Sequence, residues 1–228
     1  MPKQTWGAIF DWDGVIIDSS PAHEESWDRL AEEEHLPLPP GHFLRGFGQR
    51  NATIIPEILG WTRDPQEIAR LGDRKEALYR EILAATGLTP LPGAREWLER
   101  LKAAGIPCAI GSSTARANIT LALKETGLAP YFSSITTGED VTHGKPHPEV
   151  FLSAAAGIGL PPERCVVFED AFAGIEAGQR GGMRVVGVAT THPREALAAL
   201  PHPPDAIVER LDTLSVRELA GWFAADRR

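Results

Sequence analysis

The fold is decided by an apolar run that ends in two carboxylates, WGAIFDWDGV at residues 6–15. The run over Trp6–Phe10 predicts a short buried strand, because it is apolar and turn-forming residues close it. In an extended chain, residues two positions apart point to the same side, so Asp11 and Asp13 can face one site while Trp12 faces away. A simpler possibility is that the carboxylates only cap the following turn, with Gly14 supplying backbone freedom.

The chain beyond this strand alternates short apolar runs with segments of helical period. The apolar runs predict further strands at Pro107–Gly111, Ser134–Thr137, Cys165–Phe168, Arg184–Val188 and Ala206–Val208. Helices are expected between them at Ala94–Ala104, Ala115–Thr126, Pro148–Ala156 and Ala171–Gly181. This alternation predicts an α/β fold whose core is a Rossmann-like, doubly wound parallel sheet.

One segment breaks the alternation, because only helical patterns occur from about residue 20 to about residue 87. We expect an inserted α-helical cap domain over residues 18–89 and an α/β core formed by residues 1–17 and 90–228, frayed at 226–228. The stretch Thr89–Gly93 is too rich in Pro and Gly to continue a helix and marks the return hinge. An insertion directly after the first strand lies at the edge of the sheet where open α/β folds bind ligands. The cap is therefore placed to act as a lid.

Composition and charge narrow the class of protein. The 228 residues are 43% hydrophobic and 24% charged, as in ordinary globular proteins. The net charge of −8 argues against a nucleic-acid partner, because binding a phosphate backbone needs a concentrated basic surface. Cys108 and Cys165 lie in predicted buried strands and indicate neither a disulfide framework nor a zinc site. No signal peptide is evident, and no apolar stretch approaches the roughly 20 residues of a membrane span. We expect a cytoplasmic monomer with no membrane partner.

Polar residues follow three further predicted strands at their carboxyl ends. Ser112–Thr114 leads into a helix whose first N–H groups can hold an anion, although a plain capping role is as reasonable. Lys145, one of five lysines, is fixed between Gly144 and Pro146, whereas an isolated lysine is more often a surface residue. Glu169-Asp170 ends a predicted strand. The two carboxylates could be charges at the start of the following helix, or they could form part of a metal site. Paired hard oxygen ligands of this kind suit Mg²⁺.

Taken together and in this order, the motifs Asp-x-Asp-Gly, Ser, Lys-Pro and Glu-Asp resemble the signature of the haloacid dehalogenase-like superfamily. The chain resembles the subgroup whose helical cap is inserted after the first motif. That subgroup includes β-phosphoglucomutase and many sugar-phosphate phosphatases. The resemblance spans nearly the whole chain, and the motifs are specific as a set.

The resemblance implies roles for four catalytic residues. Asp11 would attack phosphorus and form an aspartyl-phosphate, while Asp13 would protonate the leaving oxygen and later activate the acceptor. Ser112 would hold a phosphoryl oxygen, and Lys145 would neutralise the charge of Asp11 and of the phosphoryl group. Phosphoryl transfer needs mainly positioning and charge neutralisation, which this set supplies.

The resemblance also implies a Mg²⁺ site and a substrate site. The carboxylate of Asp11, the backbone carbonyl of Asp13 and Asp170 would hold Mg²⁺, with Glu169 either as a further ligand or as a partner of one. The substrate, a small phosphorylated metabolite, would be contacted by His23, Arg45, Gly48, Arg50, Asn51, Ser113, Thr114 and Arg116.

The same resemblance does not decide whether the phosphate is released to water or transferred to another position of the substrate. Related mutases carry a Lys-Gly pair followed by an Arg that grips a second phosphate, and residues 44–51 can be aligned on either glycine. If the motif is aligned on Gly48, Phe47 takes the lysine position, and if it is aligned on Gly46, Arg45 takes that position. Neither alignment reproduces the pattern. A phosphatase is therefore the leading hypothesis, with a β-phosphoglucomutase-type mutase and a catalytically silent metabolite-binding protein as alternatives.

Two other reactions of the superfamily fit less well. Dehalogenases resemble this chain at Asp11 but lack a second acid equivalent to Asp13. Cleavage of phosphonates through a Schiff base needs a lysine early in the cap, and there is none between Asp18 and Arg74.

Overall fold

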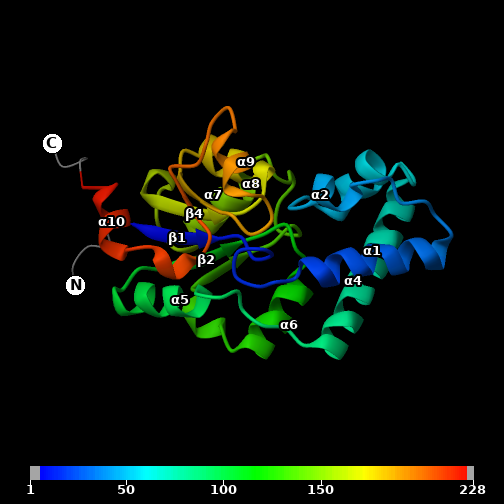
Figure 1. The fold of residues 1–228 in the computed structure, drawn as a ribbon, viewed down its shortest axis with the longest axis horizontal. Helices are drawn as coiled ribbons and strands as arrows, with labels where there is room; N and C mark the ends of the chain where they lie inside the picture. Colours follow the sequence, from blue (N-terminus) through cyan, green and yellow to red (C-terminus); the bar gives the residue numbers. More distant parts are fainter. Residues whose placement is uncertain (1–5, 225–228) are drawn as a thin grey trace.

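The computed structural model describes residues 6–224, so the expectations for residues 1–5 and for the frayed end at 226–228 lie outside it (Figure 1). A six-stranded sheet forms the core, in the order β3-β2-β1-β4-β5-β6, with every neighbouring pair parallel. The strands are β1 (Gly7–Phe10), β2 (Cys108–Gly111), β3 (Ser134–Thr136), β4 (Cys165–Glu169), β5 (Arg184–Val188) and β6 (Ala206–Val208). The predicted doubly wound α/β fold is confirmed, with the switch in strand order between β1 and β4.

Helices cover both faces of this sheet. Figure 1 shows α5 (Ala94–Ala103) and α6 (Arg116–Thr126) on one side and α7 (Glu149–Gly157), α8 (Phe172–Arg180) and α9 (Arg194–Ala198) on the other. Ala8 and Phe10 pack into the core on the α5 side, whereas Ile9 packs into the core on the α7 side. Successive side chains of β1 thus alternate between two buried faces, which explains why the strand is apolar throughout. The sequence did not predict the short helices α9 and α10 (Val216–Gly221).

The predicted cap, residues 18–89, contains helices and turns but no strand. Its helices are α1 (Ser20–Glu34), α2 (His42–Gly46), α3 (Asn51–Thr53) and α4 (Pro65–Thr86), with a π-helical turn at Ile54–Leu59. Asp64 caps α4 by accepting from the backbone N–H of Gln66 at 2.8 Å. The cap has an apolar cluster of its own, which includes Trp27, Leu30 and Leu71.

The cap leaves and rejoins the core through two adjacent segments. Ile17 forms an isolated antiparallel bridge with Pro90, and the backbone N–H of Leu91 donates to the carbonyl of Ile16 at 2.9 Å. The cap therefore stands over the carboxyl end of β1 (Figure 1). No helix within residues 6–224 is both long and apolar enough to span a bilayer.

Candidate active site

The floor of the site is a buried lysine that bridges two carboxylates at the carboxyl edge of the sheet. Asp11 follows β1, and its backbone N–H donates to the carbonyl of Phe168 in β4 at 3.0 Å. The Nζ of Lys145 donates to Oδ1 of Asp11 and to Oε2 of Glu169, both at 2.8 Å. Lys145 is only 5% exposed and is therefore not the surface residue that its isolation in the sequence suggests.

Negative charge is in excess at this floor. Burial raises the pKa of Asp11 to about 7, against the opposing effect of the Lys145 ammonium. Burial also raises the pKa of Asp170 well above its ordinary value, and the nearby Glu169 and Asp11 raise it further. For Lys145, burial alone would lower the pKa, but the two carboxylates reverse this and raise it. One ammonium thus faces three buried carboxylates, an arrangement that favours a bound cation.

Asp11 and Asp170 are the carboxylates best able to hold that cation. The carboxylate oxygens of Asp11, Glu169 and Asp170 come within 4.8 Å of one another. Both oxygens of Glu169 are engaged, since Oε2 accepts from Lys145 and Oε1 accepts from the backbone N–H groups of Asp170 and Ala171. Oδ2 of Asp170 accepts from the Thr191 hydroxyl, whereas its Oδ1 is buried with no hydrogen-bond partner. This buried, unpaired oxygen fits a divalent cation with oxygen ligands such as Mg²⁺.

Asp13 lies beside this floor and is held by hydroxyl groups. Ser19 donates to its Oδ1 at 2.5 Å, and Thr114 donates to its Oδ2. Nε2 of His23 lies 3.3 Å from the same Oδ1. Burial by itself would raise the pKa of Asp13, but His23 and the two hydroxyls outweigh burial and lower it to about 2.

Sequence reasoning missed Lys75 and Glu76, which stand behind His23 in the cap. Nζ of Lys75 lies 2.6 Å from Nδ1 of His23 and donates to Oε1 of Glu76 at 3.1 Å. An ammonium group can only donate, so Nδ1 of His23 accepts and its Nε2–H is directed to Asp13. The spacing indicates only that Lys75 is buried, because it follows Leu71 by four residues and precedes Tyr79 by four on the buried stripe of α4; it does not identify His23 as the partner.

Several contacts close the cap onto the core. The guanidinium of Arg50 donates to the carbonyls of Gly138, Val141 and Thr142 at 3.4, 3.2 and 3.0 Å. The hydroxyl of Ser113 donates to the carbonyl of Gly48 at 2.9 Å. Two of the residues predicted to bind substrate, Arg50 and Ser113, therefore join the cap to the core in this structure.

A cavity of about 520 Å³ lies between the cap and the floor. The predicted site residues on its wall are Asp11, Asp13, His23, Gly48, Arg50, Asn51, Ser112, Ser113 and Thr114. Arg45 and Arg116 are not among the lining residues. Arg45 is exposed, and the guanidinium of Arg116 pairs with Asp140 at 2.5 Å. Lys145, Glu169 and Asp170 are buried and do not line the cavity either. The sequence motifs therefore reach the cavity through Asp11, Asp13 and Ser112, and Lys145 lies behind Asp11.

Comparison with known proteins agrees with this arrangement. A family model for haloacid dehalogenase-like hydrolases matches residues 7–182. The chain is 38% identical over 216 residues to a chloroplastic 5-amino-6-(5-phospho-D-ribitylamino)uracil phosphatase of Arabidopsis thaliana, covering 93% of this chain and 56% of that protein. It is 31% identical over 247 positions to a β-phosphoglucomutase of Mycobacterium tuberculosis, covering 94% and 93%. A hydrolase of Entamoeba histolytica shares the fold, with a TM-score of 0.85, 24% identity and coverage of 96% and 99%. The chain thus spans about half of the Arabidopsis protein.

Proposed function

Because this chain belongs to the haloacid dehalogenase-like hydrolase family, we propose that it is a phosphatase that hydrolyses a small phosphorylated metabolite through a covalent intermediate on Asp11. The observation that carries the proposal is the buried bridge of Lys145 between Asp11, which lines the cavity, and Glu169 behind it. It gives Asp11 a fixed position, and it supplies positive charge where a phosphoryl group would bind.

The reaction proceeds in two displacements. The Asp11 carboxylate attacks phosphorus while the bond to the leaving oxygen breaks and Asp13 protonates that oxygen. Water, deprotonated by Asp13, then attacks the aspartyl-phosphate and releases inorganic phosphate. Asp13 is ionised before substrate binds, so the proton that it first donates must come with the substrate. Phosphate monoesters titrate near pH 6 and can therefore carry this proton into the site. The negative phosphoryl group raises the pKa of the carboxyl beside it, so that Asp13 can accept the proton.

Mg²⁺ is the proposed cofactor. The Asp11 and Asp170 carboxylates and the Asp13 carbonyl would hold it, with Glu169 fixing Lys145 and the backbone beside Asp170. When bound, the ion supplies positive charge to the phosphoryl oxygens. The unpaired Oδ1 of Asp170 supports this assignment.

Substitution of Gly14 tests the cation site. Gly14 has a φ of +75°, and a Cβ placed there would overlap the carboxylate of Asp170. We expect Gly14→Ala to weaken Mg²⁺ binding by about tenfold or more, because disturbing the groups around a metal ligand commonly has an effect of this size. Calorimetry measures the affinity. Gly182→Ala is the matched control, because Gly182 has the same φ and nothing within 4 Å of a Cβ. Equal Mg²⁺ affinity of the two variants would contradict the assignment.

The charges of the cavity favour a phosphatase over a mutase. A mutase must hold a second phosphate on the cap side, which needs a free cation. Arg50 and Lys75 are the arginine and lysine of the cavity wall. The two terminal nitrogens of Arg50 already donate to three carbonyls, and only its buried Nε is without a partner. Lys75 contacts His23 and pairs with Glu76. Asp73, Glu76 and Glu139 add negative charge to the same wall. A second phosphate would be repelled there, whereas a neutral leaving group would not.

The cap side of the cavity also has an apolar wall, formed by Trp27, Phe43, Phe47, Ile54 and Ile68. Aromatic and branched side chains of this kind suit a planar ring. The Arabidopsis relative is named for a phosphorylated ribityl chain that carries a uracil. We therefore include this compound as the leading candidate among possible substrates.

The decisive experiment measures two products from one panel of compounds with Mg²⁺ present. The panel contains 5-amino-6-(5-phospho-D-ribitylamino)uracil, fructose 1-phosphate and β-glucose 1-phosphate. We expect inorganic phosphate from the panel, with the highest kcat/KM for the uracil compound. Formation of glucose 6-phosphate without free phosphate would instead identify a mutase. No turnover of any compound, together with intact Mg²⁺ binding, would point to a metabolite-binding protein.

A further inference from the structure

A second group of metal-ligating side chains lies outside the catalytic floor. Among residues 6–224, two groups have ligand atoms within 4.8 Å of one another: Asp11, Glu169 and Asp170 form one, and His143, His147 and Glu149 form the other. We propose that His143, His147 and Glu149 form a site for a transition-metal ion such as Zn²⁺, on the loop that carries Lys145.

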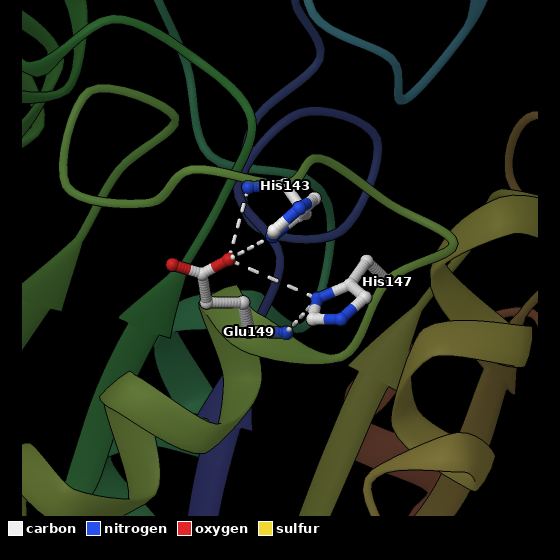
Figure 2. Close-up of side chains that lie close together, drawn as sticks. All are labelled: His143, His147 and Glu149. Carbon is white, nitrogen blue, oxygen red and sulfur yellow. Dashed lines mark hydrogen bonds and ion pairs between the residues drawn. The ribbon is translucent and has the colours of Figure 1, made fainter.

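The geometry of the three side chains is close to that of a coordinated ion. Figure 2 shows both imidazole rings facing the carboxylate of Glu149. Nδ1 of His143 lies 3.0 Å from Oε2 of Glu149, and Nδ1 of His147 lies 3.8 Å from the same oxygen. Ligands of a tetrahedral zinc ion are about 3.4 Å apart, given metal–ligand distances near 2.1 Å. Small rotations of the exposed rings are enough to close the site.

Two features hold the ligands in place before an ion binds. Oε1 and Oε2 of Glu149 accept the backbone N–H groups of Thr142 and His143, both at 2.9 Å, so the carboxylate is oriented at the start of α7. His147 stands between Pro146 and Pro148, whose rings restrict the backbone on both sides. Side chains that are already ordered lose less conformational entropy when they bind an ion.

The two imidazoles also make contacts within the loop, since Nδ1 of His143 lies 3.0 Å from Oε2 of Glu149 and Nδ1 of His147 accepts the backbone N–H of Glu149 at 3.4 Å. Glu149 holds the loop mainly through backbone N–H groups, which almost any residue at these positions could donate. The side chain of His143 is 64% exposed and that of His147 is 43% exposed, so burial does not account for the two imidazoles. Two imidazoles and one carboxylate form a donor set that suits Zn²⁺, Cu²⁺ or Ni²⁺ and is poorly suited to Mg²⁺.

Calorimetric titration of Zn²⁺ into untagged, Mg²⁺-saturated protein tests the site. We expect one Zn²⁺ ion per chain in addition to Mg²⁺. Removing a residue that only hydrogen-bonds to a metal ligand lowers metal affinity by about 10- to 100-fold. His143→Ala and His147→Ala remove a ligand itself, so each should weaken Zn²⁺ binding at least as much. His202→Ala, at an exposed histidine outside the group, and Asp170→Asn, at the catalytic floor, should leave Zn²⁺ binding unchanged.

A spectroscopic readout identifies the ligands directly. With Cu²⁺ as the probe, electron paramagnetic resonance should show nitrogen coupling from both imidazoles in the wild-type protein and from one in His143→Ala. Circular dichroism should confirm that the variants are folded, as their exposure predicts. Unchanged Zn²⁺ affinity in His143→Ala, absence of Zn²⁺ binding beyond the Mg²⁺ site, or loss of Zn²⁺ binding in Asp170→Asn would each overturn the proposal.

Discussion

Replacing Asp11 with Asn is expected to lower kcat by about four orders of magnitude or more, because a neutral amide cannot act as the attacking nucleophile. Asparagine has nearly the same shape, and its amide oxygen can still accept from Lys145. Phosphate release under saturating substrate and Mg²⁺ is the measurement. Asp73→Asn is the matched control, because Asp73 lines the same cavity without touching the floor, and we expect it to change kcat by less than about tenfold. Retention of a tenth of wild-type activity in Asp11→Asn would contradict the assignment of the nucleophile.

The same variant makes a second prediction about stability in metal-free protein. The pKa of Asp11 is raised from 3.8 to about 7 by burial, so between these pH values the folded chain binds a proton that the unfolded chain has released. The free energy of unfolding therefore falls as pH rises through this window. Asparagine has no such proton to lose. With a chelator present, we expect the free energy of unfolding of the wild type, minus that of Asp11→Asn, to decrease from about pH 4 to about pH 7. If this difference did not depend on pH, the raised pKa of Asp11 would be ruled out.

The sequence predicted the floor of the candidate site because parallel strands share one carboxyl edge. Once β1, β2 and β4 were recognised, Asp11, Ser112 and Asp170 had to lie near one another, whatever the detailed packing. Lys145 was ambiguous on its own, since a short stretch of sequence does not reveal burial. Its position in the loop between β3 and α7, together with the other motifs, resolved the ambiguity.

The residues of the cap could not be predicted in the same way. Which side chains of a helix reach a cavity depends on how the helices rotate and pack, which no local spacing determines. Arg45 and Arg50 are five residues apart, yet Arg45 is exposed while Arg50 reaches the carbonyls of the core loop at residues 138–142. Lys75 was missed because its role depends on α4 packing along α1, which brings it to His23.

Replacing Lys145 with Met should damage both stability and catalysis. The change leaves Asp11 and Glu169 buried without their ammonium partner, and breaking a buried ion pair typically costs about 3–5 kcal/mol. It also removes the fixed positive charge beside the phosphoryl group, which should lower kcat by about 10²- to 10³-fold. Denaturant unfolding and phosphate release measure the two effects. Lys102→Met, at an exposed lysine, is the control and should change stability by about 0.5 kcal/mol or less.

The double variant Lys145→Met/Glu169→Gln separates the two effects. Glutamine at position 169 removes one of the uncompensated negative charges, and its side-chain oxygen can still accept the N–H groups of Asp170 and Ala171. We therefore expect the double variant to regain part of the lost stability, because the buried charge imbalance is smaller. It should not regain activity, because no cation then faces the phosphoryl group. Recovery of activity along with stability would mean that Lys145 serves only to balance Glu169, whereas stability without turnover would assign its charge to the reaction itself.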